Sequence, residues 1–218
     1  MRTLPKAVEP TPVLGNDWRA SVRSPRYLCE AALTLLLFVL SLRICTELMH
    51  YAQARPGAPL ADPLLGAVGP IDLTWPIFVV LWSSIIAGLW YMAEDPVRLL
   101  MGLQAAALLI LFRTIALYLV PLEPLPTIIP LADPVTIYLG TGTLVTKDLF
   151  FSGHTSVMFL LFLTANYSRL KWFLLAGTIF VGAGVVLQHV HYSGDVFVAP
   201  FIAYASWRLV LMAHKRFR

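Results

Sequence analysis

The chain has 218 residues, of which 58% are hydrophobic and 13% are charged, and its formal net charge is +4. Soluble domains carry about 25% charged residues, so this composition excludes a soluble globular class and predicts an integral membrane protein. The basic residues form no patch interleaved with aromatic residues, and we therefore expect no nucleic-acid partner. A hydrocarbon core of about 30 Å needs roughly 20 apolar residues per helix, so the chain has room for about six spans and no separate soluble domain.

The N-terminal residues 1–26 contain five basic residues and four prolines, which predicts a basic cytoplasmic tail ahead of the membrane domain. The apolar run that begins at Tyr27 is longer than the roughly 7 to 15 residues of a signal-peptide core. It also lacks a clear small-residue cleavage site, so we predict an uncleaved first transmembrane helix. Arg43 and Glu47 lie four residues apart near the far end of this helix and are expected to pair.

Three connections between spans have predictable features. Residues 50–72 are rich in proline and glycine and are predicted to form an irregular external loop. Residues 120–134 contain five prolines, which excludes a helix there. Between the second and third spans, Asp95 is the predicted N-cap and Pro96 the first helical residue. The threonine and glycine content of residues 135–150 favours a short re-entrant or interfacial segment over a span.

The predicted membrane domain, residues 27–213, is an all-α bundle of six transmembrane helices, followed by a basic tail at residues 214–218. The six predicted spans run from Tyr27 to about Leu48, Leu73 to about Met92, Val97 to Leu119, Ser152 to about Tyr167, Trp172 to about Gln188, and Ser193 to about Met212.

The distribution of lysine and arginine predicts the orientation of this bundle. Nearly all loop cations lie in the two terminal tails, the turn at residues 93–98 and the loop at residues 168–171, whereas the opposite loops hold only Arg55 and Lys147. Cytoplasmic loops carry the excess of such residues, so both termini are expected to be cytoplasmic. We expect a bacterial inner-membrane protein whose polar clusters face the periplasm.

Two polar clusters adjoin apolar segments in the second half of the chain: KDLFFSGHT at residues 147–155 and HVHYSGD at residues 189–195. Burying ionisable groups at membrane depth costs free energy, so several such groups in these clusters suggest a functional site. His191 and Asp195 lie four residues apart, which on a helical turn places them on one face. A carboxylate that fixes one ring nitrogen leaves the other free to attack, so His191 is the candidate nucleophile.

The triplet Ser152, Gly153 and His154 opens a predicted helix, where free backbone N–H groups and the positive dipole end favour a phosphate group. His154 is the candidate acid that protonates a departing alcohol oxygen. Arg113, near the external end of the third span, is the candidate clamp for phosphate oxygens. None of these roles needs a metal ion, and we expect no cofactor.

The same residue types also have purely structural interpretations. Arg113 alone is typical of an arginine that buries its stem and keeps its head at the membrane interface. Asp148 alone is compatible with a helix cap, and Glu123 with a solvated loop acid. The other three histidines are interpreted as interfacial polar residues: His50, His189 and His214.

KDLFFSGHT at residues 147–155 and HYSGDVFVA at residues 191–199 resemble the two catalytic motifs of sphingomyelin synthases and their relatives, within the type 2 phosphatidic acid phosphatase superfamily. FRTIALYLVPLEPLP at residues 112–126 resembles a third motif of that family, and PLADPLLG at residues 59–66 resembles another more weakly. The resemblance implies a six-helix membrane fold and a two-step phosphohistidine mechanism. The chain has no extra soluble N-terminal domain of that family, which suggests a compact microbial member.

In the mechanism that the resemblance implies, His191 attacks the phosphorus of a phospholipid headgroup, Asp195 orients it, and His154 protonates the departing diacylglycerol oxygen. A lipid alcohol such as ceramide or diacylglycerol then takes the phosphocholine- or phosphoethanolamine-type headgroup. Asp148 matches the acid that precedes the family's FSGHT sequence and is a possible accessory residue, as are Glu123 and Tyr192.

Two other functions remain open from the sequence. A lipid phosphatase or phospholipase C-type hydrolase uses the same histidines, with water as the second acceptor. A lipid carrier or scramblase is a hypothesis of another class, although it needs neither a His–Asp pair nor a second histidine. The sequence does not predict the oligomeric state.

Overall fold

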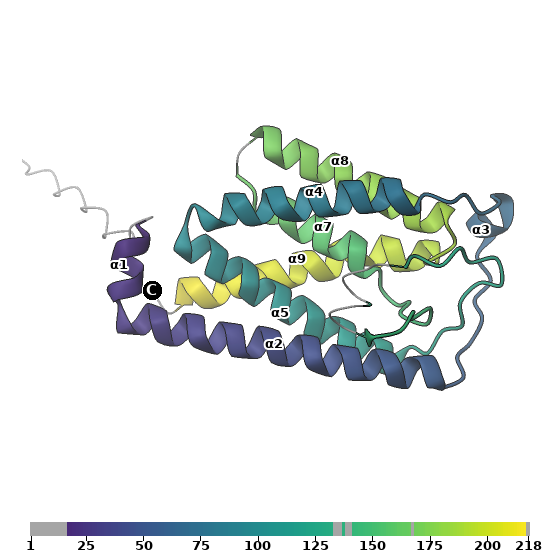
Figure 1. Cartoon of the computed structure of the whole chain (residues 1–218), viewed down its shortest axis with the longest axis horizontal. Helices are drawn as coiled ribbons and strands as arrows, with labels where there is room; N and C mark the ends of the chain where they lie inside the picture. The colour runs from purple at the N-terminus through teal and green to yellow at the C-terminus, as the bar shows by residue number, and fades with distance from the viewer. Residues whose placement is uncertain (1–16, 133–136, 138–140, 167, 217–218) are drawn as a thin grey trace, which may run out of the picture.

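The computed structural model describes residues 17–132, 137, 141–166 and 168–216. Its regular elements, within this described part of the chain, are helices, and an isolated bridge pairs Ala58 with Leu122. Figure 1 shows them as a helical bundle. The helices are α1 (Trp18–Arg23), α2 (Pro25–Ala54), α3 (Pro63–Ala67), α4 (Thr74–Ala93), α5 (Pro96–Leu119), α7 (Gly153–Thr164), α8 (Ser168–Leu187) and α9 (Ser193–Arg216).

Five of the described helices are long and apolar enough to cross a membrane: α2, α4, α5, α8 and α9. This finding supports the predicted class, an all-α integral membrane protein. The fourth predicted span corresponds to α7, which has only 12 residues, or about 18 Å at 1.5 Å per residue. The count of six transmembrane helices therefore stays a prediction.

The first span is longer than predicted at both ends. It begins at Pro25 because Ser24 supplies an N-cap, whose hydroxyl accepts from the backbone N–H of Tyr27 at 3.4 Å. It continues to Ala54, so the segment 50–72 is helical at its start. The same segment also contains α3, which means that the prediction of a wholly irregular loop was wrong.

Several local predictions are confirmed. Asp95 caps α5 by accepting from the backbone N–H of Val97 at 2.9 Å, and Pro96 is its first residue. The described residues 120–132 form no helix. Arg43 and Glu47 form an ion pair at 2.6 Å.

The last two predicted spans begin or end differently in the structure. α8 begins at Ser168, four residues before the predicted Trp172, and α9 continues to Arg216, past the predicted Met212. Part of the predicted basic tail is helical as well, since α1 lies within residues 1–26. Residues 1–16 of that tail and most of residues 133–140 lie outside the described residues.

The core of the bundle surrounds α7, which packs against α4, α5, α8 and α9. One apolar cluster joins α5, α7 and α9 through Leu109, Leu160 and Ala199. A second joins α4, α7 and α8 through Ile77 and Met158. Half of the residues of α7 are buried, as expected for a helix that faces protein on all sides.

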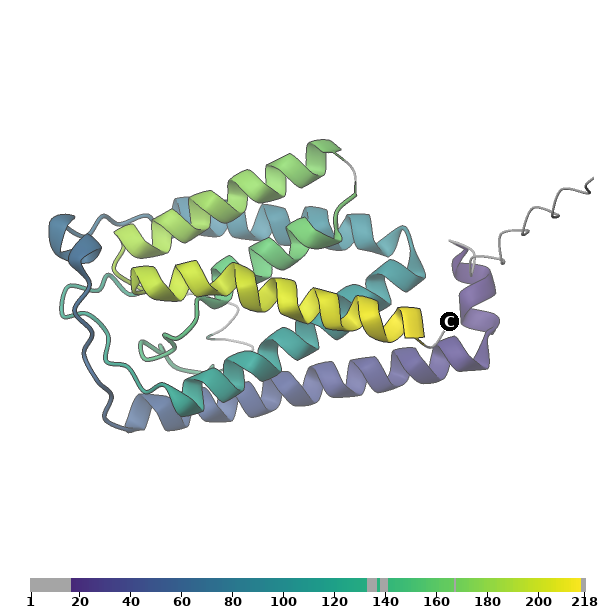
Figure 2. The same cartoon turned by 180° about the vertical axis from the view of Figure 1, so that it is seen from behind.

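The peripheral helix is α2, which packs mainly along α5 (Figure 2). The loops that carry the polar clusters gather with α3 at one end of the bundle, whereas α1 and the C-terminus lie at the other end (Figure 1). The polar clusters and the chain termini are therefore at opposite ends.

Candidate active site

A main-chain hydrogen bond joins the two polar clusters. The N–H of Ser152, directly before α7, donates to the carbonyl oxygen of Asp195, in the first turn of α9, over 3.1 Å. The two helices also pack along each other. The segments 147–155 and 189–195, separate in sequence, therefore meet at the starts of neighbouring helices.

His191 and Asp195 form a buried pair, with 2% and 1% of their surfaces exposed. His191 Nδ1 lies 3.3 Å from Asp195 Oδ2, and the same oxygen accepts from the backbone N–H of Tyr192 at 3.1 Å. Because an ionised carboxylate only accepts, Nδ1 carries a proton in this pair, and in the neutral form of the ring Nε2 carries none. The lone pair of His191 is then on Nε2, as a nucleophile requires.

The guanidinium of Arg113 orders the segment that leads into α7. Nη2 forms an ion pair with Asp148 Oδ1 at 2.6 Å and donates to the carbonyl oxygen of Asp148 at 3.3 Å, while Nη1 donates to the carbonyl oxygen of Phe151. Arg113 is 7% exposed, too buried for the interfacial alternative. These contacts use three of its five N–H donors.

Gly153 permits the close approach of Arg113 to the start of α7. A Cβ atom at this position would lie 3.0 Å from Arg113 Cζ and 3.2 Å from Nε. Such contacts are tighter than most real Cβ contacts, so a larger residue would displace the guanidinium. The positive charge of Arg113 thus lies beside the N-terminus of α7, and both favour an anion there.

Ser152 is the N-cap of α7 and is completely buried. Its hydroxyl accepts from the backbone N–H of Thr155 at 3.4 Å and lies 3.0 Å from the Thr155 hydroxyl. Its side chain therefore fixes the first helical turn. His154 is in that turn and is partly exposed, as a group that exchanges protons with a substrate must be.

Glu123 and Tyr192, the predicted accessory residues, connect the loops around the site. Glu123 Oε1 accepts from the backbone N–H of Gly57 at 2.7 Å and from Lys147 Nζ at 2.8 Å. The hydrogen bond from Lys147, followed by that from Gly57, lowers the pKa of the Glu123 carboxyl against a smaller opposing effect of desolvation. Tyr192 is buried, and its hydroxyl donates to the carbonyl oxygen of Glu123 at 2.8 Å. These contacts support a positioning role for both residues.

The interpretation of His189 as an interfacial residue is wrong. Its ring is 3% exposed, and its two nitrogens lie 2.6 Å from Thr127 Oγ1 and 2.9 Å from the carbonyl oxygen of Val68. Because a carbonyl only accepts, Nε2 carries the proton and Nδ1 accepts from the threonine. His189, two residues before the candidate nucleophile, thus joins two loops to the turn that carries it.

Gln188 has a similar function that its sequence position did not reveal. It is completely buried, and its side-chain oxygen accepts from the backbone N–H of Leu73 at 3.1 Å. Its side-chain nitrogen donates to Thr74 Oγ1 at 2.8 Å and to the carbonyl oxygen of Ile129 at 3.1 Å. The sequence signal that could have indicated this role is the run of polar residues that follows the apolar helix α8.

Asp62, within the weakly matching PLADPLLG segment, fixes the start of α9. Its Oδ2 accepts from the backbone N–H of Ser193 at 2.7 Å, and its Oδ1 accepts from the N–H groups of Leu64 and Leu65 in α3. Desolvation alone would raise the pKa of the Asp62 carboxyl, but the hydrogen bonds from Ser193, Leu65 and Leu64 together lower it. The Asp–Pro pair that opens α3 was its sequence signal.

The histidines do not extend into a larger ligand set. In the described part of the chain, no group of three or more His, Cys, Asp or Glu side chains is placed to hold a metal ion. The other two histidines interpreted as interfacial residues differ from each other: His50 is exposed, whereas His214 is partly exposed and contacts Gln104 and Glu30.

A model of a known protein family matches part of the chain. The family described as PAP2 superfamily C-terminal matches residues 147–213, a range that contains both polar clusters together with α7, α8 and nearly all of α9. No curated protein matches the chain. The geometry of this region and the family match together support a relationship to the type 2 phosphatidic acid phosphatase superfamily, without distinguishing the sphingomyelin synthase-like family within it.

Proposed function

We propose that this protein is a membrane lipid phosphotransferase that moves a phospho-headgroup from a phospholipid to a lipid alcohol through a phosphohistidine. The superfamily match suggests an activity of the lipid phosphatase or phosphotransferase type. The observation that carries the proposal is the buried His191–Asp195 pair, which a backbone bond joins to the N-terminus of α7 beside Arg113. These contacts support the assignment of the candidate nucleophile and the candidate anion-binding group to one site.

In the first step, His191 Nε2 attacks the phosphorus of the phospholipid, and the bond from phosphorus to the diacylglycerol oxygen breaks. His154 gives its proton to that oxygen, so diacylglycerol leaves as a neutral alcohol. Asp195 holds the Nδ1 proton and stabilises the positive charge that develops on the imidazole ring.

In the second step, the hydroxyl of an acceptor lipid attacks the phosphohistidine. His154, now neutral, takes the hydroxyl proton, the bond between nitrogen and phosphorus breaks, and His191 regains its lone pair. The product carries the headgroup on a new alcohol. With water in place of the lipid alcohol, the same sequence of steps gives a hydrolase, which is our second candidate.

Charge at phosphorus is stabilised by Arg113 and the N-terminus of α7. The transition state carries more negative charge at phosphorus than the ground state does. Hydrogen-bond donors whose positions are already fixed therefore stabilise the transition state more than the ground state. Asp148 and the Phe151 carbonyl hold the guanidinium in this position. The fixed geometry supports a catalytic role for Arg113 through its remaining donors.

We further propose that both termini are cytoplasmic and that the site faces the opposite side, the periplasm in a bacterial inner membrane. The asymmetry of lysine and arginine supports this orientation. The location of α1 and the C-terminus at the end away from the polar clusters agrees with it (Figure 1).

The test uses the full chain in vesicles that contain phosphatidylcholine or phosphatidylethanolamine together with ceramide or diacylglycerol. A transferase makes a new headgroup lipid. Release of a soluble phosphocholine-type product instead identifies a phospholipase C-type hydrolase, and release of inorganic phosphate from phosphatidic acid identifies a phosphatase. His191→Ala should abolish each of these reactions, while His50→Ala, which changes an exposed histidine, should retain them.

The carrier hypothesis predicts a different result for the same variant. If lipid moves between leaflets at equal rates with the native chain and His191→Ala, and neither makes a product, the chain is a carrier. Trapping of a labelled phospho-headgroup on the native chain after denaturation under alkaline conditions, absent from His191→Ala, would support the phosphohistidine directly, because its N–P bond survives base but not acid.

A further inference from the structure

A cavity of about 650 Å³ lies between α2, α5 and α9, at the end of the bundle that carries α1. α2 and α9 each pack along α5 but make few contacts with each other, and the cavity occupies the space between them. Asp195 and His214 are 19 residues apart on α9, which corresponds to about 28 Å. The cavity is thus far from the candidate active site.

The walls of the cavity are apolar side chains from all three helices. On α2 they lie at positions such as Leu33, Leu37 and Leu40, whose spacing places them on one helical face. On α5 the lining residues run from Val97 to Leu111, a rise of about 21 Å. One leaflet occupies about half of a 30 Å hydrocarbon core, so the cavity is long enough for an acyl chain.

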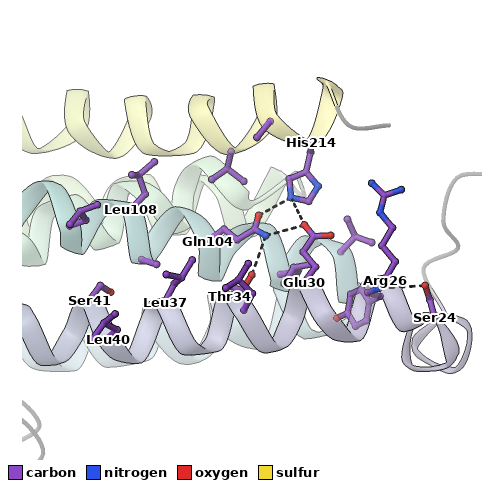
Figure 3. A pocket seen from close by; sticks show the side chains of 18 of the residues that line it. Ser24, Arg26, Glu30, Thr34, Leu37, Leu40, Ser41, Gln104, Leu108 and His214 are labelled. Carbon is purple, nitrogen blue, oxygen red and sulfur yellow. Dashed lines mark hydrogen bonds and ion pairs between the residues drawn. The ribbon is translucent and has the colours of Figure 1, made fainter.

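One end of this apolar cavity is polar (Figure 3). Gln104 Nε2 donates to Glu30 Oε1 and to Thr34 Oγ1, each at 3.1 Å. His214 Nε2 lies 2.7 Å from Gln104 Oε1 and 3.4 Å from Glu30 Oε1. Arg26 lines the cavity beside this network. The cavity therefore has the chemistry of an amphiphile site, with an apolar body and a polar end.

The charge at this end favours an anionic amphiphile. The one acidic side chain that lines the cavity, Glu30, is already engaged by Gln104 and His214. Other basic residues lie in α1 and at the end of α9, on the same side of the bundle: Arg19, Arg23 and Lys215. Basic pockets between transmembrane helices at a membrane face are typical binding sites for anionic lipid headgroups.

We propose that this cavity binds one anionic phospholipid from the leaflet that faces the chain termini. One acyl chain lies along the apolar walls between α2 and α9, and the phosphate lies beside Arg26. The site differs from the ordinary lipid-facing surface because three helices line it and a hydrogen-bonded network closes its polar end. It does not depend on the proposed reaction, whose residues lie at the other end of the bundle.

Native mass spectrometry of the full chain, taken from vesicles with equal phosphatidylglycerol and phosphatidylcholine, tests this site. The native chain should retain one phosphatidylglycerol in preference to phosphatidylcholine. Leu37→Trp fills the cavity and should lower retention at least tenfold. Leu36→Trp makes the same change at a neighbouring exposed leucine that does not line the cavity, and should leave retention unchanged.

A second pair of variants tests the charge. Arg26→Gln should weaken phosphatidylglycerol retention about fivefold, whereas Arg23→Gln removes an equal charge that does not line the cavity and should weaken retention less. Leu108→Phe, a smaller filling change on α5, replaces Leu37→Trp if that variant has a lower unfolding temperature.

Equal retention in the Leu36 and Leu37 variants, equal retention of the two lipids, or displacement by glycerol phosphate without an acyl chain would each overturn the proposal. His191→Ala should retain the lipid as the native chain does. Loss of catalysis and loss of lipid binding are therefore separable results.

Discussion

The guanidinium of Arg113 lies directly against Gly153, so that a Cβ atom at position 153 would be 3.0 Å from Arg113 Cζ. This contact joins the third predicted motif, on α5, to the first turn of α7. It also places the two candidate phosphate-binding groups, the Arg113 guanidinium and the N-terminus of α7, next to each other, where both can bind one phosphate group. The guanidinium can lie this close to the N-terminus of α7 because glycine has no side chain at position 153.

Gly153→Ala should therefore impair catalysis more than folding. The added methyl group displaces the guanidinium by a few tenths of an ångström or more, and small misplacements of catalytic groups cost up to about 100-fold in rate. We expect kcat to fall about 10- to 100-fold. Gly66→Ala, where a Cβ meets nothing within 4 Å, is the matched control and should keep native turnover in the vesicle assay.

Asp195→Asn should separate the charge of this residue from its shape. The amide can still accept from the Tyr192 N–H, so α9 should keep its first turn. It no longer stabilises a positive imidazole, and we expect kcat to fall about 10²- to 10⁴-fold. A fall of less than tenfold, measured on protein with a native unfolding temperature, would show that His191 does not act as the proposed nucleophile.

Stability should decline in acid through two loop carboxylates. The pKa values of Asp62 and Glu123 are lowered in the folded chain from ordinary values of 3.8 and 4.5. A lowered folded pKa gives stability that is present above the unfolded pKa and lost as pH falls through the folded pKa. Unfolding temperatures should therefore be flat above about pH 5 and drop below about pH 4.

Asp62→Asn provides the check on that acid-dependent stability. The variant should show a smaller drop in unfolding temperature between neutral and acidic pH than the native chain. Asp17→Asn, a change at an exposed carboxylate in the cap of α1, is the control and should keep the native profile. An unchanged profile for Asp62→Asn would mean that its bond to the Ser193 N–H does not contribute to acid sensitivity.

Gln188→Leu should destabilise the turn that carries His191. The substitution keeps an apolar side chain of similar size but leaves the Leu73 N–H, the Thr74 hydroxyl and the Ile129 carbonyl without their buried partner. Each buried polar group left unpaired costs about 1–3 kcal/mol. We expect a lower unfolding temperature together with reduced turnover, and Gln53→Leu, on α2, is a comparison with weaker burial.

Features set by local sequence were predictable. Hydropathy predicted an all-α membrane protein, the Asp95–Pro96 pair predicted the start of α5, and the spacing of four between His191 and Asp195 predicted their pairing. The last two depend on residues within four positions of one another, and the first depends on continuous runs of about 20 apolar residues, so none of them requires a contact between distant segments.

Features set by distant contacts were not predictable in the same way. α7 has only 12 residues and packs against four other helices, contacts that its own sequence does not specify. Gln188 and His189 bond to segments more than 50 residues away, so nothing in their neighbourhood indicates which loops they join. His214 likewise contacts α2 and α5 across the bundle.

The hydrogen bond from Ser152 to Asp195 joins main-chain atoms only. Any residue except proline at position 152 supplies the N–H, and any residue at position 195 supplies the carbonyl. The registration of the starts of α7 and α9 therefore does not require a particular side chain at positions 152 and 195. Side chains near this junction can therefore change while the main-chain bond still holds the two helix starts at the same distance.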